Sequence, residues 1–126
     1  KDKEREKYKT SAMIHTRQRL HQRYPHLSRT VSYKDLKGAQ GINLYPTTNR
    51  ESFQTRHVIA TLINDELVYI VKSISKNIVH TVLTRAMVEE QVAEWELNIT
   101  IDESTLRDAI NSKYRTIKTY MEDYNL

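Results

Sequence analysis

Apolar side chains recur at steps of three and four between about Glu66 and Glu96, which is the spacing of one face of a helix. The apolar positions of this segment are Leu67, Val71, Ile74, Ile78, Val79, Val82, Leu83, Ala86, Met87, Val92 and Ala93. The pattern predicts one continuous amphipathic helix of about 30 residues, longer than the average helix of a globular protein. No glycine or proline interrupts it.

Shorter elements flank this predicted long helix. Asn49 or Ser52 is placed to cap a short helix before it. The segment 97–101 alternates apolar and polar residues, as a short strand does. Asp102 or Ser104 is placed to cap a further helix that runs towards the end of the chain. The order short helix, long helix, extended piece, helix predicts an all-α fold.

The first part of the chain, residues 1–50, differs from the rest. Residues 1–24 contain no helix breaker and predict a helix with a thin apolar stripe, and Pro25 ends it. Residues 26–50 predict a loop, because both glycines and the second proline fall within them. We therefore expect an N-terminal arm over residues 1–50 and a helical domain over residues 51–126.

Charge divides the chain at the same place. Residues 1–50 hold 12 Lys and Arg against 4 Asp and Glu, whereas residues 51–126 hold 8 against 12. The arm is therefore basic and the domain mildly acidic. Basic side chains can contact the phosphates of a nucleic acid, and those that we expect to do so are Arg17, Arg19, Arg23, Lys34 and Lys37. The alternative for the arm is a tail that docks on another protein.

The residue patterns of catalytic and cofactor sites are missing from the sequence. The chain has no cysteine, which excludes disulfides, thiolate zinc sites and a cysteine nucleophile. His15, His21 and His26 are not spaced like the metal-binding histidines of one helix. Gly38 and Gly41 form a Gly-x-x-Gly without the flanking helices of a KH domain. We predict no enzymatic activity, metal, cofactor or small-molecule substrate, and no membrane span.

The predicted helices of residues 52–114 carry short motifs of a known family. These motifs are Glu51-Ser52-Phe53, Ile74-Ser75-Lys76, Trp95 and Leu106-Arg107-Asp108-Ala109-Ile110. In these positions the chain resembles the TATA-binding-protein-associated factors that form the larger partner of a histone-fold pair in TFIID. The resemblance implies a histone fold of short helix, long central helix and short third helix, here with a basic N-terminal extension.

The resemblance also implies a function in assembly. The chain would be a non-enzymatic, nuclear subunit of an RNA polymerase II transcription-initiation complex, and would heterodimerise through its histone fold to help assemble the TATA-binding-protein module. A long apolar helix also needs a partner, since each large apolar side chain left in water forfeits about 1.5–3 kcal/mol. We thus predict an obligate dimer with a second histone-fold protein, bound through Phe53, Ile59, Ile74, Ile78, Val82, Met87, Leu106 and Ile110.

Two other functions stay open on the sequence. One is a histone-fold subunit that contacts DNA directly, although residues 51–126 carry a net charge of −4 (8 minus 12), the wrong sign for wrapping DNA. The other is a DNA-binding helical regulator or replication accessory protein of a bacterium or phage. In the first case the basic arm would make the contact, and the affinity would fall steeply with salt. In the second case a recognition helix could lie in the arm.

Overall fold

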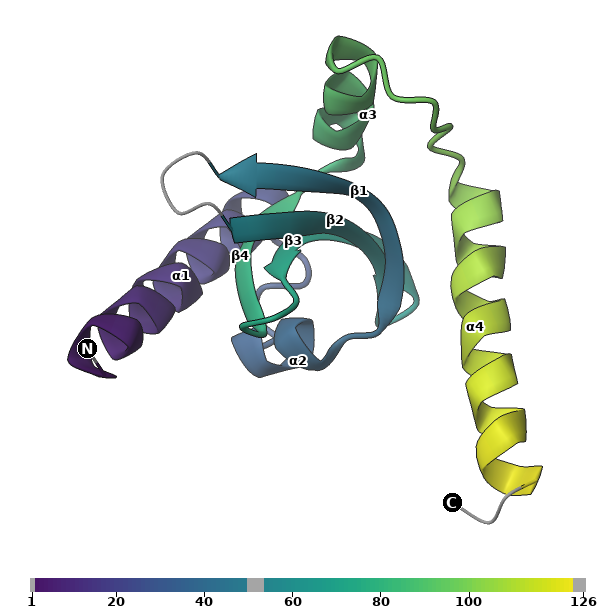
Figure 1. The fold of residues 1–126 in the computed structure, drawn as a ribbon, viewed down its shortest axis with the longest axis horizontal. Coiled ribbons are helices and arrows are strands. Elements are labelled where there is room, and N and C mark those ends of the chain that lie inside the picture. The colour runs from purple at the N-terminus through teal and green to yellow at the C-terminus, as the bar shows by residue number, and fades with distance from the viewer. Residues whose placement is uncertain (1, 50–53, 124–126) are drawn as a thin grey trace.

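The computed structural model describes the backbone of residues 2–49 and 54–123, and the side chains of residues 7–47 and 55–113. The chain forms a four-stranded antiparallel sheet with helices on both sides (Figure 1). In chain order the elements are α1 (Asp2–Arg23), α2 (Tyr33–Gly38), β1 (Gly41–Asn49), β2 (Gln54–Ile63), β3 (Glu66–Ser73), β4 (Ile78–Leu83), α3 (Arg85–Glu94) and α4 (Glu103–Asp123).

The sheet is a meander in which each strand pairs with the next along the chain. A two-residue turn of Asn64 and Asp65 joins β2 to β3, and both residues have positive φ angles, 50° and 64°. Two-residue hairpin turns need this left-handed backbone, which Asn and Asp tolerate better than most residues. Asn77 has a φ of 53° in the turn between β3 and β4. The hairpins therefore form without glycine.

The predicted long helix between Glu66 and Glu96 is wrong, because this segment forms β3, β4 and α3. β3 is buried on both faces, so its side chains are apolar in succession instead of alternating. A run of this kind does not distinguish a buried strand from a buried helix by its period alone. The all-α fold and the histone fold are therefore wrong, and the protein is an α+β protein.

The resemblance to the TATA-binding-protein-associated factors is wrong for the same reason. The Ile74-Ser75-Lys76 motif, expected in the middle of a helix, lies in the turn between β3 and β4. The short helix expected before it is β2, and the expected loop over residues 26–50 contains α2 and β1. Residues 97–101, which alternate like a strand, are not part of any strand.

The two terminal helices confirm the predictions made for them. α1 ends at Arg23, directly before Tyr24 and Pro25. α4 begins at Glu103, and the carboxylate of Asp102 accepts a hydrogen bond from the backbone N–H of Thr105 at 3.0 Å. Pro25 ends α1 and Asp102 caps α4 as the sequence predicts, because each effect depends only on residues next to it along the chain.

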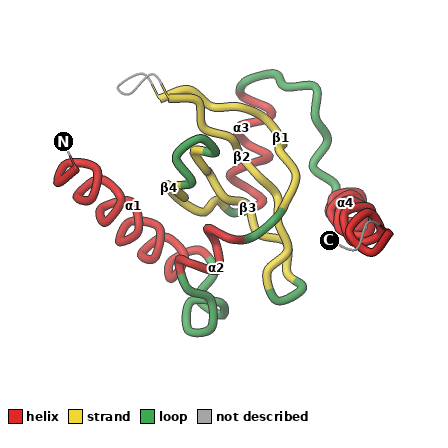
Figure 2. Tube along the Cα trace, turned by 60° about the horizontal axis from the view of Figure 1, so that its bottom comes forward, coloured by secondary structure: helices red, strands yellow, loops and turns green. Residues whose placement is uncertain are grey.

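Each face of the sheet has its own core. Figure 2 shows helices on either side of the strands. The residues that pack α1 and α2 on one face are Leu20, Tyr24, Leu27, Val31, Leu36, Ile59, Ile63, Val68, Ile70, Val79 and Val82. The residues that pack α3 and α4 on the other face are Tyr45, Val58, Ala60, Leu67, Tyr69, Val71, Leu83, Val88, Ile101, Leu106 and Ile110. The sheet is thus the middle of three layers.

Side chains of residues 1–50 bind the backbone of β4 at the edge of the sheet. The Thr16 hydroxyl donates to the Val79 carbonyl at 2.8 Å, and the Tyr24 hydroxyl donates to the Leu83 carbonyl at 2.7 Å. The guanidinium of Arg23 donates to the Val82 carbonyl. An open strand edge invites pairing with other chains. The predicted arm therefore packs closely on the sheet, and the boundary predicted after residue 50 falls between β1 and β2, which pair with each other.

Candidate functional site

A groove runs along the second half of α1 and the loop that follows it. Its volume is about 1200 Å³. The residues that line it are Ile14, Arg17, Gln18, Leu20, His21, Gln22, Pro25, His26, Ser28, Arg29 and Val31. The helix places Arg17 and His21 one turn apart on the same side, and the loop after Pro25 contributes Arg29 to the lining of the same groove. No Asp or Glu is among these lining residues.

The two arginines of the groove are free to bind a ligand. Both Arg17 and Arg29 are exposed, and within the described part of the chain their side chains have no hydrogen bond or ion pair. The histidines of the groove are engaged: His21 contacts the hydroxyl of Ser28 at 3.3 Å, and His26 contacts Glu66 at 2.7 Å. The groove is therefore lined by two unpaired guanidinium groups among polar and apolar side chains.

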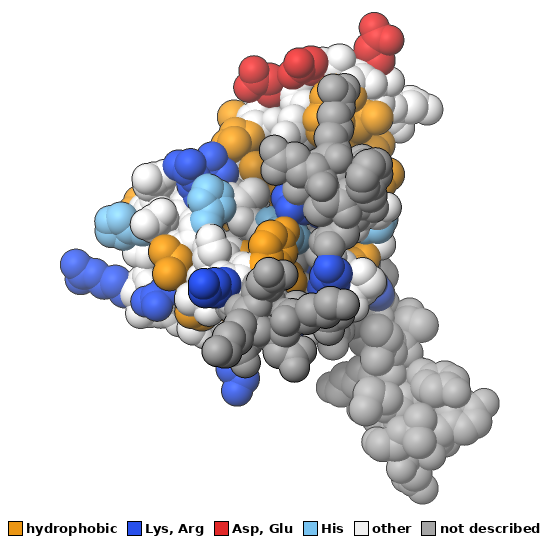
Figure 3. Space-filling model, turned by 60° about the vertical axis from the view of Figure 1, so that its left-hand side comes forward, with side chains coloured by type: hydrophobic (Ala, Val, Ile, Leu, Met, Phe, Trp, Pro, Cys, Tyr) orange, Lys and Arg blue, Asp and Glu red, His pale blue; other side chains and the backbone are white. Residues whose placement is uncertain are grey.

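The pKa of a histidine on α1 indicates a positive electrostatic potential along this helix. The pKa of His15 is lowered from its usual value, first by partial burial and then by the positive charges of Arg19 and Arg23. A nearby positive charge disfavours the protonated imidazole. Figure 3 shows Lys and Arg side chains spread over this side of the molecule, while Asp and Glu side chains gather at one end of the view.

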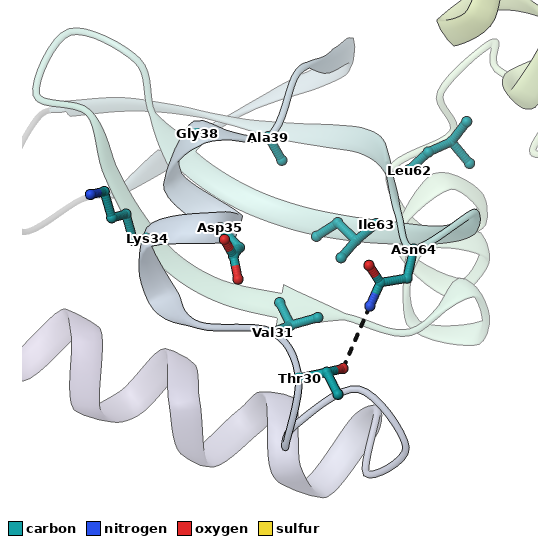
Figure 4. A pocket seen from close by; sticks show the side chains of 9 residues that line it. All are labelled: Thr30, Val31, Lys34, Asp35, Gly38, Ala39, Leu62, Ile63 and Asn64. Atoms are coloured by element: carbon teal, nitrogen blue, oxygen red, sulfur yellow. Dashed lines mark hydrogen bonds between the residues drawn. The ribbon is translucent and has the colours of Figure 1, made fainter.

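A smaller pocket continues the same surface towards α2 (Figure 4). Its volume is about 620 Å³, and its lining residues are Thr30, Val31, Lys34, Asp35, Gly38, Ala39, Leu62, Ile63 and Asn64. Val31 lines both cavities. Ser32 caps α2 through a reciprocal pair of hydrogen bonds with Asp35, and these bonds lower the pKa of the Asp35 carboxyl. Asp35 is therefore engaged in the cap, whereas the exposed Lys34 adds a positive charge.

The five residues predicted to bind nucleic acid divide into two groups. Arg17, Lys34 and Lys37 are exposed. Arg19 is half-buried and donates to Gln22 at 2.7 Å, and Arg23 binds the backbone of β4. We define the basic surface as Arg17, Arg29, Lys34 and Lys37. Arg29 was missing from the predicted set, since the sequence does not show that its loop folds back beside α1.

The aromatic residues near these cations serve the fold. The Tyr24 hydroxyl donates to a backbone carbonyl of β4, and burial raises its pKa to about 12. The Tyr33 hydroxyl accepts from the Val79 N–H at 3.0 Å. Tyr8 contacts Arg56 and His80. None of these three rings lines the groove, so base stacking by them is not part of this site.

The residues predicted to bind a partner mostly lie inside the chain. Those buried in the fold are Ile59, Ile78, Val82, Leu106 and Ile110. Met87 is half-buried, and Ile74 is 49% exposed in the turn between β3 and β4. Phe53 lies outside the described residues. The prediction of an obligate dimer depended on an uncovered 30-residue helix, but the strands and helices of one chain cover most of these side chains.

The described residues contain no group of three or more His, Asp or Glu side chains arranged to hold a metal ion. Glu89, Glu90 and Glu94 are exposed on α3, and Glu89 pairs with Arg85 at 2.8 Å. Gly38 ends α2 and Gly41 begins β1, so the Gly-x-x-Gly joins a helix to a strand. No helix in the described part of the chain has the length and apolar content that crossing a bilayer requires.

Comparison with known proteins found no related protein. No protein-family model matches the chain, and neither the curated proteins nor the solved structures contain a significant match. The proposal that follows therefore depends on the geometry of the site alone.

Proposed function

We propose that this protein is a non-enzymatic nucleic-acid-binding protein that holds the phosphate backbone through its basic surface. The observation that carries the proposal is the groove along α1, which is lined by the unpaired Arg17 and Arg29 and by no carboxylate. A guanidinium group matches the geometry of a phosphate and forms charge-assisted hydrogen bonds with it.

The phosphate backbone fits this surface better than the bases do. The tyrosines that could stack on bases form hydrogen bonds within the fold. Binding through cations alone is independent of sequence and depends strongly on salt. We therefore expect binding that tolerates changes in the base sequence.

The predicted role in an RNA polymerase II initiation complex depended on a histone fold, and a chain built around a four-stranded sheet gives it no support. The alternative that the arm contacts nucleic acid does not depend on that fold. It needs only exposed cations held in a fixed arrangement, and α1, its following loop and α2 supply them.

Fluorescence anisotropy with a short labelled DNA duplex and the matching single strand tests the proposal. Charge-assisted hydrogen bonds contribute about 1.5–3 kcal/mol each, so the double substitution Arg17→Gln, Arg29→Gln should weaken binding by about a hundredfold or more. Lys113→Gln is the control, because Lys113 lies on α4, which packs on the other face of the sheet. Equal affinity of the double variant and the wild type would overturn the proposal.

A further inference from the structure

The smaller pocket, beside α2, differs in chemistry from the groove along α1. Its volume of about 620 Å³ lies within the range of about 300–1,000 Å³ that is usual for pockets that bind small molecules. The side chains of Val31 and Ile63 point into it from the loop and from the end of β2 (Figure 4), and both are buried. Its polar lining residues are exposed. An occupant would therefore contact apolar side chains at its inner end and polar side chains where it meets solvent.

Two exposed residues of this pocket have oxygen atoms that can accept further hydrogen bonds. The carboxylate of Asp35 accepts from the Ser32 N–H at 2.9 Å in the cap of α2, but a carboxylate has about four acceptor positions. The amide nitrogen of Asn64 donates to the Thr30 hydroxyl at 3.5 Å, and its amide oxygen has no partner in the described part of the chain. The pocket therefore suits an occupant that donates hydrogen bonds.

The charge of Asp35 also restricts the occupant. The hydrogen bonds of the cap lower the pKa of the Asp35 carboxyl, so this group is negative at pH 7 and repels a phosphate. The cation of this pocket, Lys34, extends away from Val31 and Ile63 in Figure 4. The pocket therefore favours an uncharged group with amino donors, whereas the groove, which is lined by no carboxylate, favours a phosphate.

The pocket and the groove adjoin through three consecutive residues. Arg29 lines the groove, Thr30 lines the pocket and Val31 lines both. Consecutive Cα atoms lie about 3.8 Å apart, so one nucleotide can reach from a phosphate on Arg29 to the pocket. Lys34 lines the pocket as well, and within the described residues its side chain has no hydrogen bond or ion pair. It is therefore available for the next phosphate of the same strand.

A nucleobase combines the properties that this pocket requires. It has flat faces that pack on apolar side chains and an edge that carries hydrogen-bonding groups. Adenine and cytosine present an amino donor where thymine presents a carbonyl acceptor. In a duplex the bases are paired and stacked, so a base enters a protein pocket only when it leaves the stack. The ligand that fits both cavities at once is therefore a single strand.

We propose that the pocket holds one unpaired, amino-bearing base of a single-stranded nucleic acid whose phosphates bind the basic surface. The inference rests on the proposed function, since Arg29 and Lys34 would hold the phosphates on either side of that base. The preference concerns one nucleotide, and the rest of the strand is held without regard to its bases.

Binding of the wild-type protein to labelled single strands, measured by fluorescence anisotropy, tests the pocket. One strand contains only thymidine, and the other has adenine at one central position. The adenine strand should bind about three- to tenfold more tightly, because its amino group gains hydrogen bonds that a thymine carbonyl cannot form. A strand with cytosine at that position should bind like the adenine strand. If all three strands have the same dissociation constant, or cytosine behaves like thymine, the inference is overturned.

Two variants locate this preference in the pocket. A Cβ at Gly38 meets nothing within 4 Å, so Gly38→Leu has room in the fold and should fill part of the pocket and abolish the preference for adenine. Gly38→Ala is the matched control and should retain it. Asn64→Gly tolerates the positive φ of the turn, 50°, and removes the amide, so the preference should fall. A full preference for adenine in both Gly38→Leu and Asn64→Gly would overturn the assignment.

Two further ligands distinguish this inference from the proposed function. A duplex should bind Gly38→Leu and the wild type equally, because it uses only the basic surface. If the wild type binds the duplex but does not distinguish adenine from thymine in the strand, the pocket is wrong and the proposed function stands. If it binds neither ligand, both are wrong. Adenosine monophosphate should bind at least about tenfold more weakly than the adenine strand, and equal affinity would overturn the assignment of the pocket to a strand.

Discussion

At the residue scale, Gly41 shows how closely the backbones approach at the start of β1. A Cβ atom at Gly41 would overlap the carbonyl of Ala60 in β2 and crowd a side-chain carbon of Ile59. Backbone atoms cannot move aside as the end of a flexible side chain can. Position 41 therefore requires glycine because a side chain has no space there. A positive φ is not the reason, since no glycine in the described structure adopts one.

We predict that Gly41→Ala destabilises the protein by about 1–3 kcal/mol, the usual cost of overpacking. Gly38→Ala is the matched control, because a Cβ there meets nothing within 4 Å. The control should be neutral or more stable by a few tenths of a kcal/mol, since alanine restricts the unfolded chain. Urea unfolding of both variants measures the difference. Equal stabilities would contradict this account of Gly41.

His80 gives the protein a pH-dependent stability. Its pKa is about 4 in the folded protein, below the usual 6.5, so the unfolded chain binds a proton more readily. Stability should therefore be highest above about pH 6.5 and fall as the pH drops towards 4. His80→Gln should flatten this part of the profile, and His21→Gln, at an exposed histidine, is the control. Urea unfolding at several pH values tests this, and an unchanged slope in His80→Gln would contradict it.

At the scale of elements, α1 is bound to the sheet edge by hydrogen bonds as well as by apolar contacts. Thr16 is 0% exposed and donates to the Val79 carbonyl at 2.8 Å. Leu20 of α1 and Tyr24, the residue after its end, continue the same contact. α1 is therefore part of the domain core and protects the edge of β4.

Replacing Thr16 by valine keeps the shape of the side chain and removes its hydroxyl. We expect Thr16→Val to destabilise the protein by about 1–3 kcal/mol, because the buried carbonyl of Val79 loses a donor. Thr10→Val on the exposed side of α1 is the control and should change stability by less than about 0.5 kcal/mol. Thermal or urea unfolding gives both values. A neutral Thr16→Val would mean that α1 does not depend on this bond.

The elements that the sequence predicts correctly are those with local signals. α1 has its proline stop and α4 has its Asp102 cap. The sheet was missed because β3 is buried on both faces and its apolar run shows no alternation. The turns were missed because Asn64, Asp65 and Asn77 adopt the positive φ angles that glycine commonly supplies.

The candidate site was predicted in part. The sequence places the cations in the first 50 residues, and Arg17 and Lys34 are exposed as expected. It does not show that Arg23 is used by the fold, that Arg29 lines the same groove as Arg17, or that Arg56 lies near enough to His80 for its charge to act on the imidazole. These relations depend on tertiary contacts between distant segments, which residue spacing does not reveal.

At the scale of the whole molecule, the basic surface is formed by one continuous stretch of the chain. Arg17 lies on α1, Arg29 on the loop after it, and Lys34 and Lys37 on α2. These exposed cations suit a long polyanion. Because α1 also packs on β4, the domain core holds this surface in place.

The salt dependence of DNA binding tests the central claim most directly. Each phosphate contact contributes about −0.9 to the slope of log K against log salt concentration. We predict a steep negative slope for the wild type and a slope that is shallower by about 1.8 for Arg17→Gln, Arg29→Gln, if each arginine holds one phosphate. Lys113→Gln should leave the slope unchanged. The absence of binding at low salt, or the same slope in the double variant and the wild type, would contradict a phosphate-binding role for the basic surface.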